Sequence, residues 1–279
     1  MVVPPGVDAE VLRFLERHEA RVHALPGRQI RDLGDAILLH DPLDREPFWN
    51  RVNAIHWPDD ARAFDRRLGE TIALFATLDR IPHIWPRDAF NEPADLADRL
   101  LTHGFVDVGG GHLMVLADPE PSGYIERRRL APGVTLERLH GITGDERIRA
   151  AAGIAHVLID AFDVEPDRRA AIELETEAMF DLADLHACLI RVDGEPAAAA
   201  KRATFDGATY LSSIGTRNEF RGRGLGALAT AAMTADANAE GCRWTYLGVF
   251  AGNDVAIRLY ERLGFVRLGP AAPDLLLRE

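Results

Sequence analysis

Residues 214–226 read Ile-Gly-Thr-Arg-Asn-Glu-Phe-Arg-Gly-Arg-Gly-Leu-Gly, with three glycines and two arginines between Arg221 and Gly226. The segment follows an apolar stretch typical of a strand and precedes a long stretch typical of a helix. A helix N-terminus has unpaired N–H groups and a partial positive charge, and glycines let an anion approach them. The pattern therefore predicts a phosphate-binding turn, and a plain strand-to-helix turn is the alternative.

Two common phosphate-binding motifs do not fit this turn. A Walker A loop ends in Gly-Lys followed by Ser or Thr, and no such ending is present. The dinucleotide fingerprint Gly-x-Gly-x-x-Gly needs a third glycine at position 227, which is Ala227. Use of the turn for ATP stays open as a separate hypothesis.

The spacing Arg221-x-x-Gly224-x-Gly226 resembles the acyl-CoA motif of the GNAT (Gcn5-related N-acetyltransferase) superfamily, Gln/Arg-x-x-Gly-x-Gly/Ala. Downstream, residues 253–265 resemble the family's block Asn-x-x-Ala-x-x-Leu-Tyr-x-x-x-Gly-Phe. The two blocks occur in the family's order, and each lies where an expected strand is followed by an expected helix. The resemblance covers residues 134–279.

The resemblance implies a site for acetyl-CoA as co-substrate. It assigns the pyrophosphate to the main-chain N–H groups of Arg221, Gly222, Arg223, Gly224, Leu225, Gly226 and Ala227. It implies that the pantetheine arm pairs with the strand edge at Ile214, Gly215 and Thr216. Asn253 would lie near the pantetheine, with a plain helix N-cap as the alternative. Tyr260 would protonate the departing thiolate, with a core aromatic as the alternative.

The reaction implied is N-acetyl transfer from acetyl-CoA to a primary amine of a small molecule or peptide by direct attack. Many relatives carry a Glu on the strand before the cradle as general base, but residues 208–216 contain no carboxylate. The remaining candidates are Glu173, Glu175, Glu177, Glu219 and His186, or a water chain. A non-catalytic acyl-CoA sensor or scaffold is therefore the alternative function.

The elements that must position these residues follow the order βααβββαβαββ. We expect strands at 134–139, 186–192, 197–205, 208–216, 243–250, 265–268 and 275–277, and helices at 145–162, 168–180, 224–240 and 254–263. Asp193-Gly194 and Asp206-Gly207 predict two-residue hairpins, so three strands should run antiparallel. The crossover helix 224–240 should make its flanking strands parallel neighbours.

The first half contains a weaker copy of the second block. Residues 93–105 end in Gly104-Phe105, as residues 253–265 end in Gly264-Phe265, and Leu100 falls opposite Tyr260. We expect helices at 8–24, 65–78 and 93–103, with strands at 36–39, 48–55, 83–85, 106–108 and 113–116. The helix at 65–78 has no glycine cradle before it, so this copy should lack CoA binding. Trp49, Trp57, Trp85 and His83 are candidates for an acceptor wall, although core packing is the plainer role.

These patterns predict an α/β (α+β) protein with two GNAT-like domains, each a mixed sheet flanked by helices. The first, residues 1–131, would be degenerate and without a CoA motif, and the second, residues 132–279, would be catalytic. Residues 118–133 hold three Pro, two Gly and the run Arg127-Arg128-Arg129, and should join the domains.

Composition restricts the partners. The net charge is −12, and each half carries 16 basic against 22 acidic groups. Neither half is basic, so no nucleic-acid or anionic-membrane partner is expected, and a homodimer stays open. Cys188 and Cys242 should be buried thiols, no metal site is expected, and no membrane span or signal peptide is indicated. The expected location is the cytoplasm.

Overall fold

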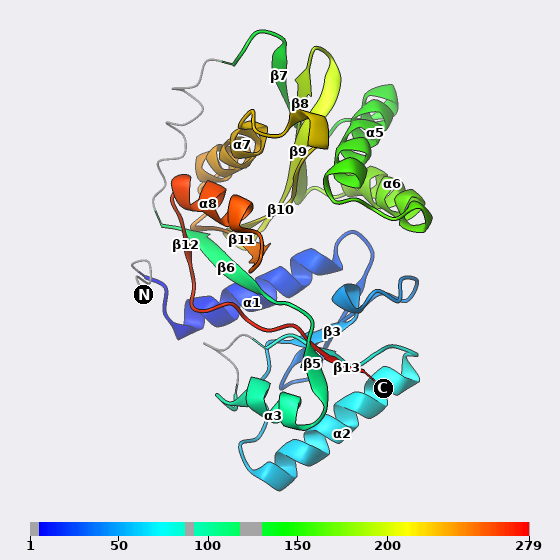
Figure 1. Cartoon of the computed structure of the whole chain (residues 1–279), viewed down its shortest axis with the longest axis vertical. Coiled ribbons are helices and arrows are strands. Elements are labelled where there is room, and N and C mark those ends of the chain that lie inside the picture. Colours follow the sequence, from blue (N-terminus) through cyan, green and yellow to red (C-terminus); the bar gives the residue numbers. More distant parts are fainter. Residues whose placement is uncertain (1–5, 87–91, 118–129, 279) are drawn as a thin grey trace. The chain divides into compact units, whose positions relative to one another are not determined.

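The computed structural model describes residues 6–86, 92–117 and 130–278 (Figure 1). The chain divides into two compact units that alternate along the sequence. The first unit comprises Met1–Leu113, Val249–Asp254 and Arg267–Glu279. The second comprises Met114–Gly248 and Val255–Val266. The predicted domain boundary after residue 131 is a single cut, whereas the first unit ends its long segment at Leu113 and includes two short segments near the C-terminus.

A six-stranded sheet forms the centre of the first unit, in the order β1-β2-β3-β4-β13-β5. Its elements are α1 (Ala9–Ala24), β1 (Gln29–Asp32), β2 (Ile37–His40), a 3-10 turn (Pro47–Trp49), β3 (Arg51–Asn53), α2 (Ala61–Thr77), β4 (His83–Ile84), α3 (Leu96–Thr102), β5 (Phe105–Asp107) and β13 (Leu275–Leu277). Strands β1 to β3 are antiparallel, and β3 and β4 are parallel.

The two long helices of this unit contact opposite faces of its sheet. Neighbouring residues of a strand point to opposite faces. Accordingly, Ile37 packs with Ala20 of α1, whereas Leu38 packs in a larger cluster with Phe64 and Phe75 of α2. Leu100 of α3, which aligns with Tyr260 of the second block, is fully buried in this larger cluster.

A seven-stranded sheet forms the centre of the second unit, in the order β12-β6-β11-β10-β9-β8-β7. Its elements are β6 (Gly111–Leu116), β7 (Val134–Leu139), α5 (Gly144–Ala161), α6 (Arg169–Ala178), β8 (Leu185–Val192), β9 (Glu195–Phe205), β10 (Ala208–Thr216), α7 (Leu225–Ala239), β11 (Trp244–Phe250), α8 (Asp254–Arg262) and β12 (Phe265–Arg267). Short 3-10 turns lie at Pro166–Arg168, Met179–Asp181 and Asn218–Phe220.

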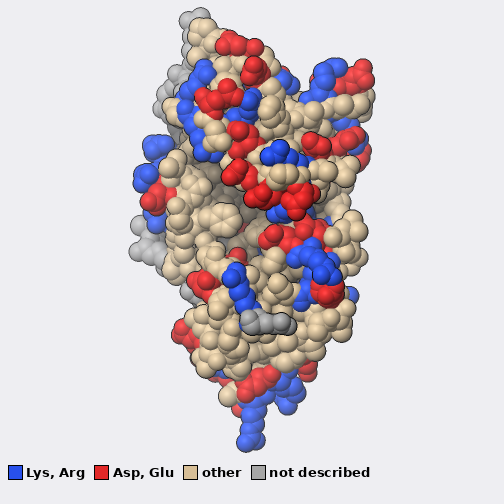
Figure 2. Space-filling view, turned by 45° about the vertical axis from the view of Figure 1, so that its right-hand side comes forward, with Lys and Arg blue, Asp and Glu red and all other residues tan. Residues whose placement is uncertain are grey.

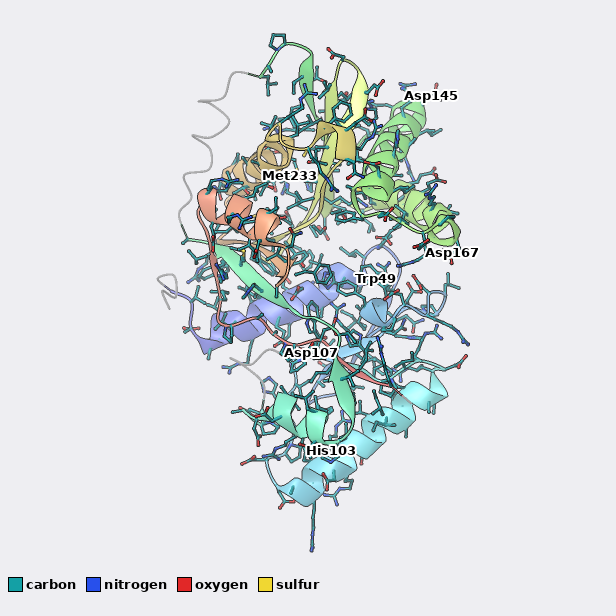
Figure 3. The ribbon with its side chains drawn as sticks, in the orientation of Figure 1. Trp49, His103, Asp107, Asp145, Asp167 and Met233 are labelled. Carbon is teal, nitrogen blue, oxygen red and sulfur yellow. The ribbon has the colours of Figure 1, made fainter. Side chains whose placement is uncertain are left out.

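Helices cover both faces of this sheet. Figure 1 shows α5 and α6 on one side of β8 and β9 and α7 on the other. Leu189 of β8 packs in a cluster with Ile154 and Leu158 of α5. The neighbouring Cys188 points to the other face, where its Sγ lies 3.8 Å from the carbonyl oxygen of Ala229 in α7. Met233, labelled on α7 in Figure 3, is also buried.

The predicted pairing around β10 is confirmed. Asp193-Gly194 and Asp206-Gly207 all have positive φ, between +51° and +86°, as a type I′ turn requires. Strands β8, β9 and β10 are therefore antiparallel neighbours. Across the crossover helix α7, β10 and β11 are parallel, with Ala208 opposite Trp244.

The last expected strand of each half pairs differently from the prediction. Leu275–Leu277 was expected to close the second sheet, but as β13 it lies between β4 and β5 of the first sheet, antiparallel to both. Conversely, β6 lies between β11 and β12 of the second sheet. In each sheet, a strand that is distant in sequence therefore lies between two others. One of these precedes the helix-Gly-Phe block of that sheet, and the other follows it.

Smaller differences concern exposed or irregular segments. Strand β1 was not predicted, because all four of its residues are exposed and show no apolar alternation. Residues 48–55 form a 3-10 turn and the three-residue β3 instead of one strand, and α3 begins at Leu96 instead of Pro93. Cys188 is buried, but Cys242 is only partly buried, which corrects the prediction for that thiol. Residues 118–129 of the predicted linker lie outside the described residues.

Candidate active site

The turn into α7 has an open helix N-terminus. Gly224 is its N-cap residue with φ +75°, and Gly222 has φ +76°, a conformation that residues with a Cβ adopt with strain. In the described structure no side chain caps this helix, whose first intrahelical bond runs from Leu228 N–H to Gly224 O at 3.1 Å. The first-turn N–H groups are therefore available to an anion.

Gly226 is the point where three elements of the second unit meet. A Cβ placed on Gly226 would lie 3.3 Å from Thr216 Oγ1 at the end of β10 and 3.6 Å from Leu259 Cδ1 of α8. Its neighbours Leu225 and Ala227 are buried. The third glycine of the turn thus allows close packing of α7 on β10 and α8, whereas Gly222 has open space where a Cβ would be.

The arginines of the turn make defined intramolecular contacts. Arg221 donates from Nη2 to Ala161 O at 3.0 Å and from Nε to Thr216 O at 3.3 Å, so its side chain lies against the C-terminal end of α5. The guanidinium of Arg223 lies 5.7 Å from the ring centre of Phe220. The Arg221 side chain is thus engaged with carbonyl oxygens, and anion binding by the main-chain N–H groups of the turn stays a prediction.

Strands β10 and β11 separate just before the turn. Their parallel pairing runs from Ala208 opposite Trp244 to Leu211 opposite Leu247, although β10 continues to Thr216 and β11 to Phe250. The register of β10 against β9 shifts between Ser212 and Gly215, and Ser213 has φ +51°. This bulge turns the end of β10 away from β11, so the predicted edge at Ile214, Gly215 and Thr216 lies beyond the last paired residue.

Tyr260 lies on α8, next to the residue that approaches Gly226. It is 7% exposed, and its ring contacts Phe265 edge-on at 6.1 Å between centroids. Burial raises the pKa of its hydroxyl to about 12, so the phenol is protonated at neutral pH. The protonated hydroxyl can donate a hydrogen bond or a proton, as the role predicted for Tyr260 requires.

Asn253 directly precedes α8, and its N–H donates to Phe250 O at 3.0 Å. This position fits the N-cap alternative, and it falls among the residues grouped with the first unit. Its contact with the pantetheine stays a prediction.

The candidate bases are distributed over several elements. Glu219 pairs with Arg217, and Glu173 and Glu177 are exposed on α6. His186 stacks on His140 at 4.0 Å and lies 3.1 Å from Arg202, whose guanidinium binds Glu240 after the last turn of α7. Because α7 has 15 residues and is about 22 Å long, His186 is remote from the glycine turn at the other end of that helix.

In the first unit, groups of the protein itself occupy the helix N-terminus and the strand end that correspond to the glycine turn and the edge of β10. The Asp60 side chain caps α2, accepting from Ala63 N–H at 2.9 Å, so an acid occupies the helix N-terminus. Beyond β3, Ile55 O accepts from Glu92 N–H at 3.0 Å and Trp57 N–H donates to Glu92 O at 2.7 Å. Ala54 N–H donates to Glu16 Oε1 of α1 at 2.7 Å. The end of this strand is therefore paired by protein groups.

The aromatic wall candidates also make internal contacts. Trp57 is buried in the core cluster against Phe64. The Arg28 guanidinium lies over Trp49, 3.6 Å from the ring centre. The Arg51 guanidinium lies 4.1 Å from the ring centre of Trp85. His83 is buried and hydrogen-bonds Pro47 O and Asp274. Core packing accounts for Trp57 and His83.

No basic patch marks the drawn surface. On the face in Figure 2, basic and acidic side chains are interspersed, and the basic ones do not merge into one area. Within the described residues, no helix combines the length and apolar character that a membrane crossing needs. The same residues contain no group of three or more His, Cys, Asp or Glu placed to hold a metal ion.

Comparison with known proteins tests the assignment of this site. Residues 151–265, which include the glycine turn and Tyr260, match the model of the Acetyltransferase (GNAT) family. This C-terminal part of the chain belongs to the GNAT superfamily. The predicted family is thereby confirmed. No curated protein matches the chain significantly.

Solved structures extend the likeness to both sheets of this GNAT protein. A GCN5-related N-acetyltransferase from Kribbella flavida is 28% identical with TM-score 0.69, over 99% of this chain and 97% of that one. One from Sphaerobacter thermophilus is 17% identical with TM-score 0.63, over 94% and 86% of the chains. A tandem GNAT protein from the clavulanic acid biosynthesis pathway is 14% identical with TM-score 0.64, over 93% and 88%. The fold is thus that of two GNAT-like domains.

Proposed function

We propose that this GNAT protein transfers an acetyl group from acetyl-CoA to a primary amine of a small molecule or peptide. The observation that carries the proposal is the juxtaposition at Gly226. The open N-terminus of α7, the end of β10 beyond its pairing with β11, and the α8 residue preceding Tyr260 meet there. Acyl transfer needs an anion-binding turn, an open strand edge and a proton donor, and these three elements supply them.

The residues of the turn suit a CoA diphosphate. The N–H groups of the turn and of the first α7 residues would bind its oxygens, because the helix N-terminus is uncapped and Gly222 leaves room for a close approach. The strand edge from Ile214 to Thr216 would pair with the pantetheine amides as an added strand does. The co-substrate supplies an acyl group activated as a thioester.

Direct attack requires the protein to stabilise the developing charge, to protonate the departing sulfur and to let the ammonium proton leave. The amine nitrogen forms a bond to the acyl carbon as the bond to sulfur breaks, and negative charge develops on the acyl oxygen. Main-chain N–H groups at the β10 bulge would stabilise that charge. The protonated Tyr260 hydroxyl donates to the departing sulfur. The ammonium proton leaves through water or a group outside β10, which carries no carboxylate.

The first unit has a different role in this proposal. Asp60 places a carboxylate at the N-terminus of α2, where a diphosphate would be repelled, and Glu92 already pairs with the strand end. We therefore assign CoA binding to the second unit alone, with the first as a degenerate copy.

One observation favours a non-catalytic acyl-CoA sensor, namely the absence of a carboxylate on β10. Incubating the full chain with acetyl-CoA and a panel of amines, with release of free thiol as the readout, separates the two functions. The enzyme releases thiol in proportion to N-acetylated product with at least one amine. Binding of CoA without release for any amine favours the sensor, and displacement of CoA by ATP favours a nucleotide site.

A further inference from the structure

The glycine turn is attached to a helix far from it in sequence. Asp160, in the last turn of α5, accepts from Asn218 N–H through Oδ2 at 2.6 Å, and Asn218 Nδ2 donates back to Asp160 O at 3.3 Å. Three residues later, Arg221 donates to Ala161 O at 3.0 Å. The loop between β10 and α7 is therefore held by the C-terminal end of α5 at two points.

These contacts provide hydrogen-bond partners both for the end of α5 and for the loop. The last carbonyl groups of a helix have no intrahelical donor, and the C-terminal end of a helix attracts positive charge. Asn218 and Arg221 supply donors to the carbonyl oxygens of Asp160 and Ala161. The Asp160 carboxylate in turn accepts from the N–H of Asn218, the first residue of the 3-10 turn Asn218–Phe220.

The approach of α5 depends on one glycine of β10. A Cβ on Gly215 would lie 2.9 Å from the Ala161 Cβ, so only glycine allows this spacing. On the other side, Arg217 donates from Nη1 to Pro196 O at 2.9 Å and from its N–H to Ala197 O at 2.9 Å. The loop is thus fixed by β9 at its start and by α5 from Asn218 to Arg221.

We propose that Asp160 is a positioning residue for the phosphate cradle. It touches neither of the reacting groups assigned above, and it acts by fixing the 3-10 turn from which Arg221 to Gly226 continue. Its carboxylate holds the main chain four residues before Gly222, so the N–H groups of the cradle converge before the diphosphate arrives. This inference rests on the proposed function and names an element outside the family's two motifs.

The test compares two acyl donors in Asp160→Ala. Acetyl-CoA uses the cradle, whereas S-acetylpantetheine has no diphosphate and does not. We expect the affinity for CoA and the KM for acetyl-CoA to worsen about tenfold, as befits one charge-assisted hydrogen bond. The kcat with saturating acetyl-CoA and the kcat/KM for S-acetylpantetheine should stay within about twofold of the wild type, because the loss of uniform binding raises KM and leaves kcat unchanged.

Two further variants control for general loosening. Asp160→Asn keeps an oxygen that can accept from Asn218 N–H and should restore most of the CoA affinity. Asp181→Ala removes the carboxylate that pairs with Arg147 near the other end of α5, and it should leave CoA affinity unchanged. Equal losses for both donors, no rescue by Asp160→Asn, or unaltered CoA affinity in Asp160→Ala would each overturn the inference.

Hydrogen exchange separates this inference from the proposed function. In Asp160→Ala without any ligand, the hydrogen-bonded amides of Asn218, Phe220 and Arg221 should exchange faster, while those of β8 keep their wild-type rates. If wild-type protein bound no CoA, the proposed function would fail, and this exchange pattern would still test the positioning of the loop. Unchanged exchange at Phe220 and Arg221 would remove Asp160 from that role.

Discussion

Gly226 lies against Thr216 so closely that a Cβ on the glycine would be 3.3 Å from the threonine hydroxyl oxygen. This contact joins the first turn of α7 to the end of β10. The turn therefore serves two purposes, since its glycines expose N–H groups to an anion and also bring the helix near the strand edge that the acyl donor would use.

The contact predicts coupling between these two residues. Gly226→Ala gains helix propensity of about 0.5–1 kcal/mol, but its methyl group meets the Thr216 side chain. In the Thr216→Ala background this conflict is removed, so the substitution should become stabilising. A double-mutant cycle of urea unfolding should give a coupling free energy of about 1 kcal/mol. Additive effects of the two substitutions would show that the contact carries no strain.

Gly224→Glu should abolish CoA binding. The residue has φ +75° at the helix N-cap, so a side chain costs about 1–2 kcal/mol in backbone strain, and its carboxylate competes with phosphate for the same N–H groups. Calorimetric titration should show affinity reduced by more than about a hundredfold, which corresponds to about 2.8 kcal/mol of binding free energy.

Gly207→Glu is the matched control for that substitution. Gly207 has φ +74° in the hairpin before β10, with nothing within 4 Å of where a Cβ would lie. It should lose similar stability and keep its CoA affinity. Equal loss of CoA affinity in both variants would point to general destabilisation.

Tyr260→Phe should reduce turnover and leave CoA affinity unchanged. Burial keeps the pKa of the hydroxyl near 12, so the wild-type residue donates a proton that phenylalanine lacks. We expect kcat for acetyl-CoA to fall about 10²-fold, in the range for general acid catalysis. A thioester with a more acidic leaving thiol needs less protonation, and its kcat should fall much less. The same loss with both donors would exclude Tyr260 as the acid.

The stability of the second unit should depend on His186. Burial first, then Arg202 and His140, lower its pKa from 6.5 to about 4, so the unfolded state binds more protons than the folded state between these values. Stability is therefore fully present above pH 6.5 and is lost as the pH falls toward 4. Because the His186 side chain is partly exposed, we expect only about 1–2 kcal/mol after allowance for solvent screening.

His186→Gln isolates this contribution, since glutamine stays neutral and can still accept from Arg202. The free energy of unfolding at pH 4.5 and pH 7 should differ less in the variant than in the wild type. An identical pH dependence in both proteins would contradict the role given to His186.

The local elements and the glycine turn were accessible from sequence because their signals are short-range. Asp193-Gly194 fixes its own hairpin, and the glycines at 222 and 224 take the positive φ that the turn needs. The sheet membership of β6 and β13 was not accessible. A short apolar run such as Leu275–Leu277 indicates a strand, but it does not specify which strand pairs with it.

The contacts that shape the candidate site were also beyond sequence reasoning. Asp160 binds Asn218 across 58 positions of the chain, and Glu16 binds Ala54 N–H across 38. The charge of Arg221 suggested a phosphate ligand, whereas its side chain binds carbonyl oxygens of α5 and β10. Only the three-dimensional packing of α5 on β10 brings these groups together.

The most direct test of the central claim is the calorimetric titration of CoA into the full-length protein. The second unit has an open glycine turn, and the first has an acid-capped helix and a paired strand end. The account predicts one CoA per chain, with binding lost in Gly224→Glu and kept in Gly207→Glu. A stoichiometry of two, or binding that survives Gly224→Glu, would contradict it.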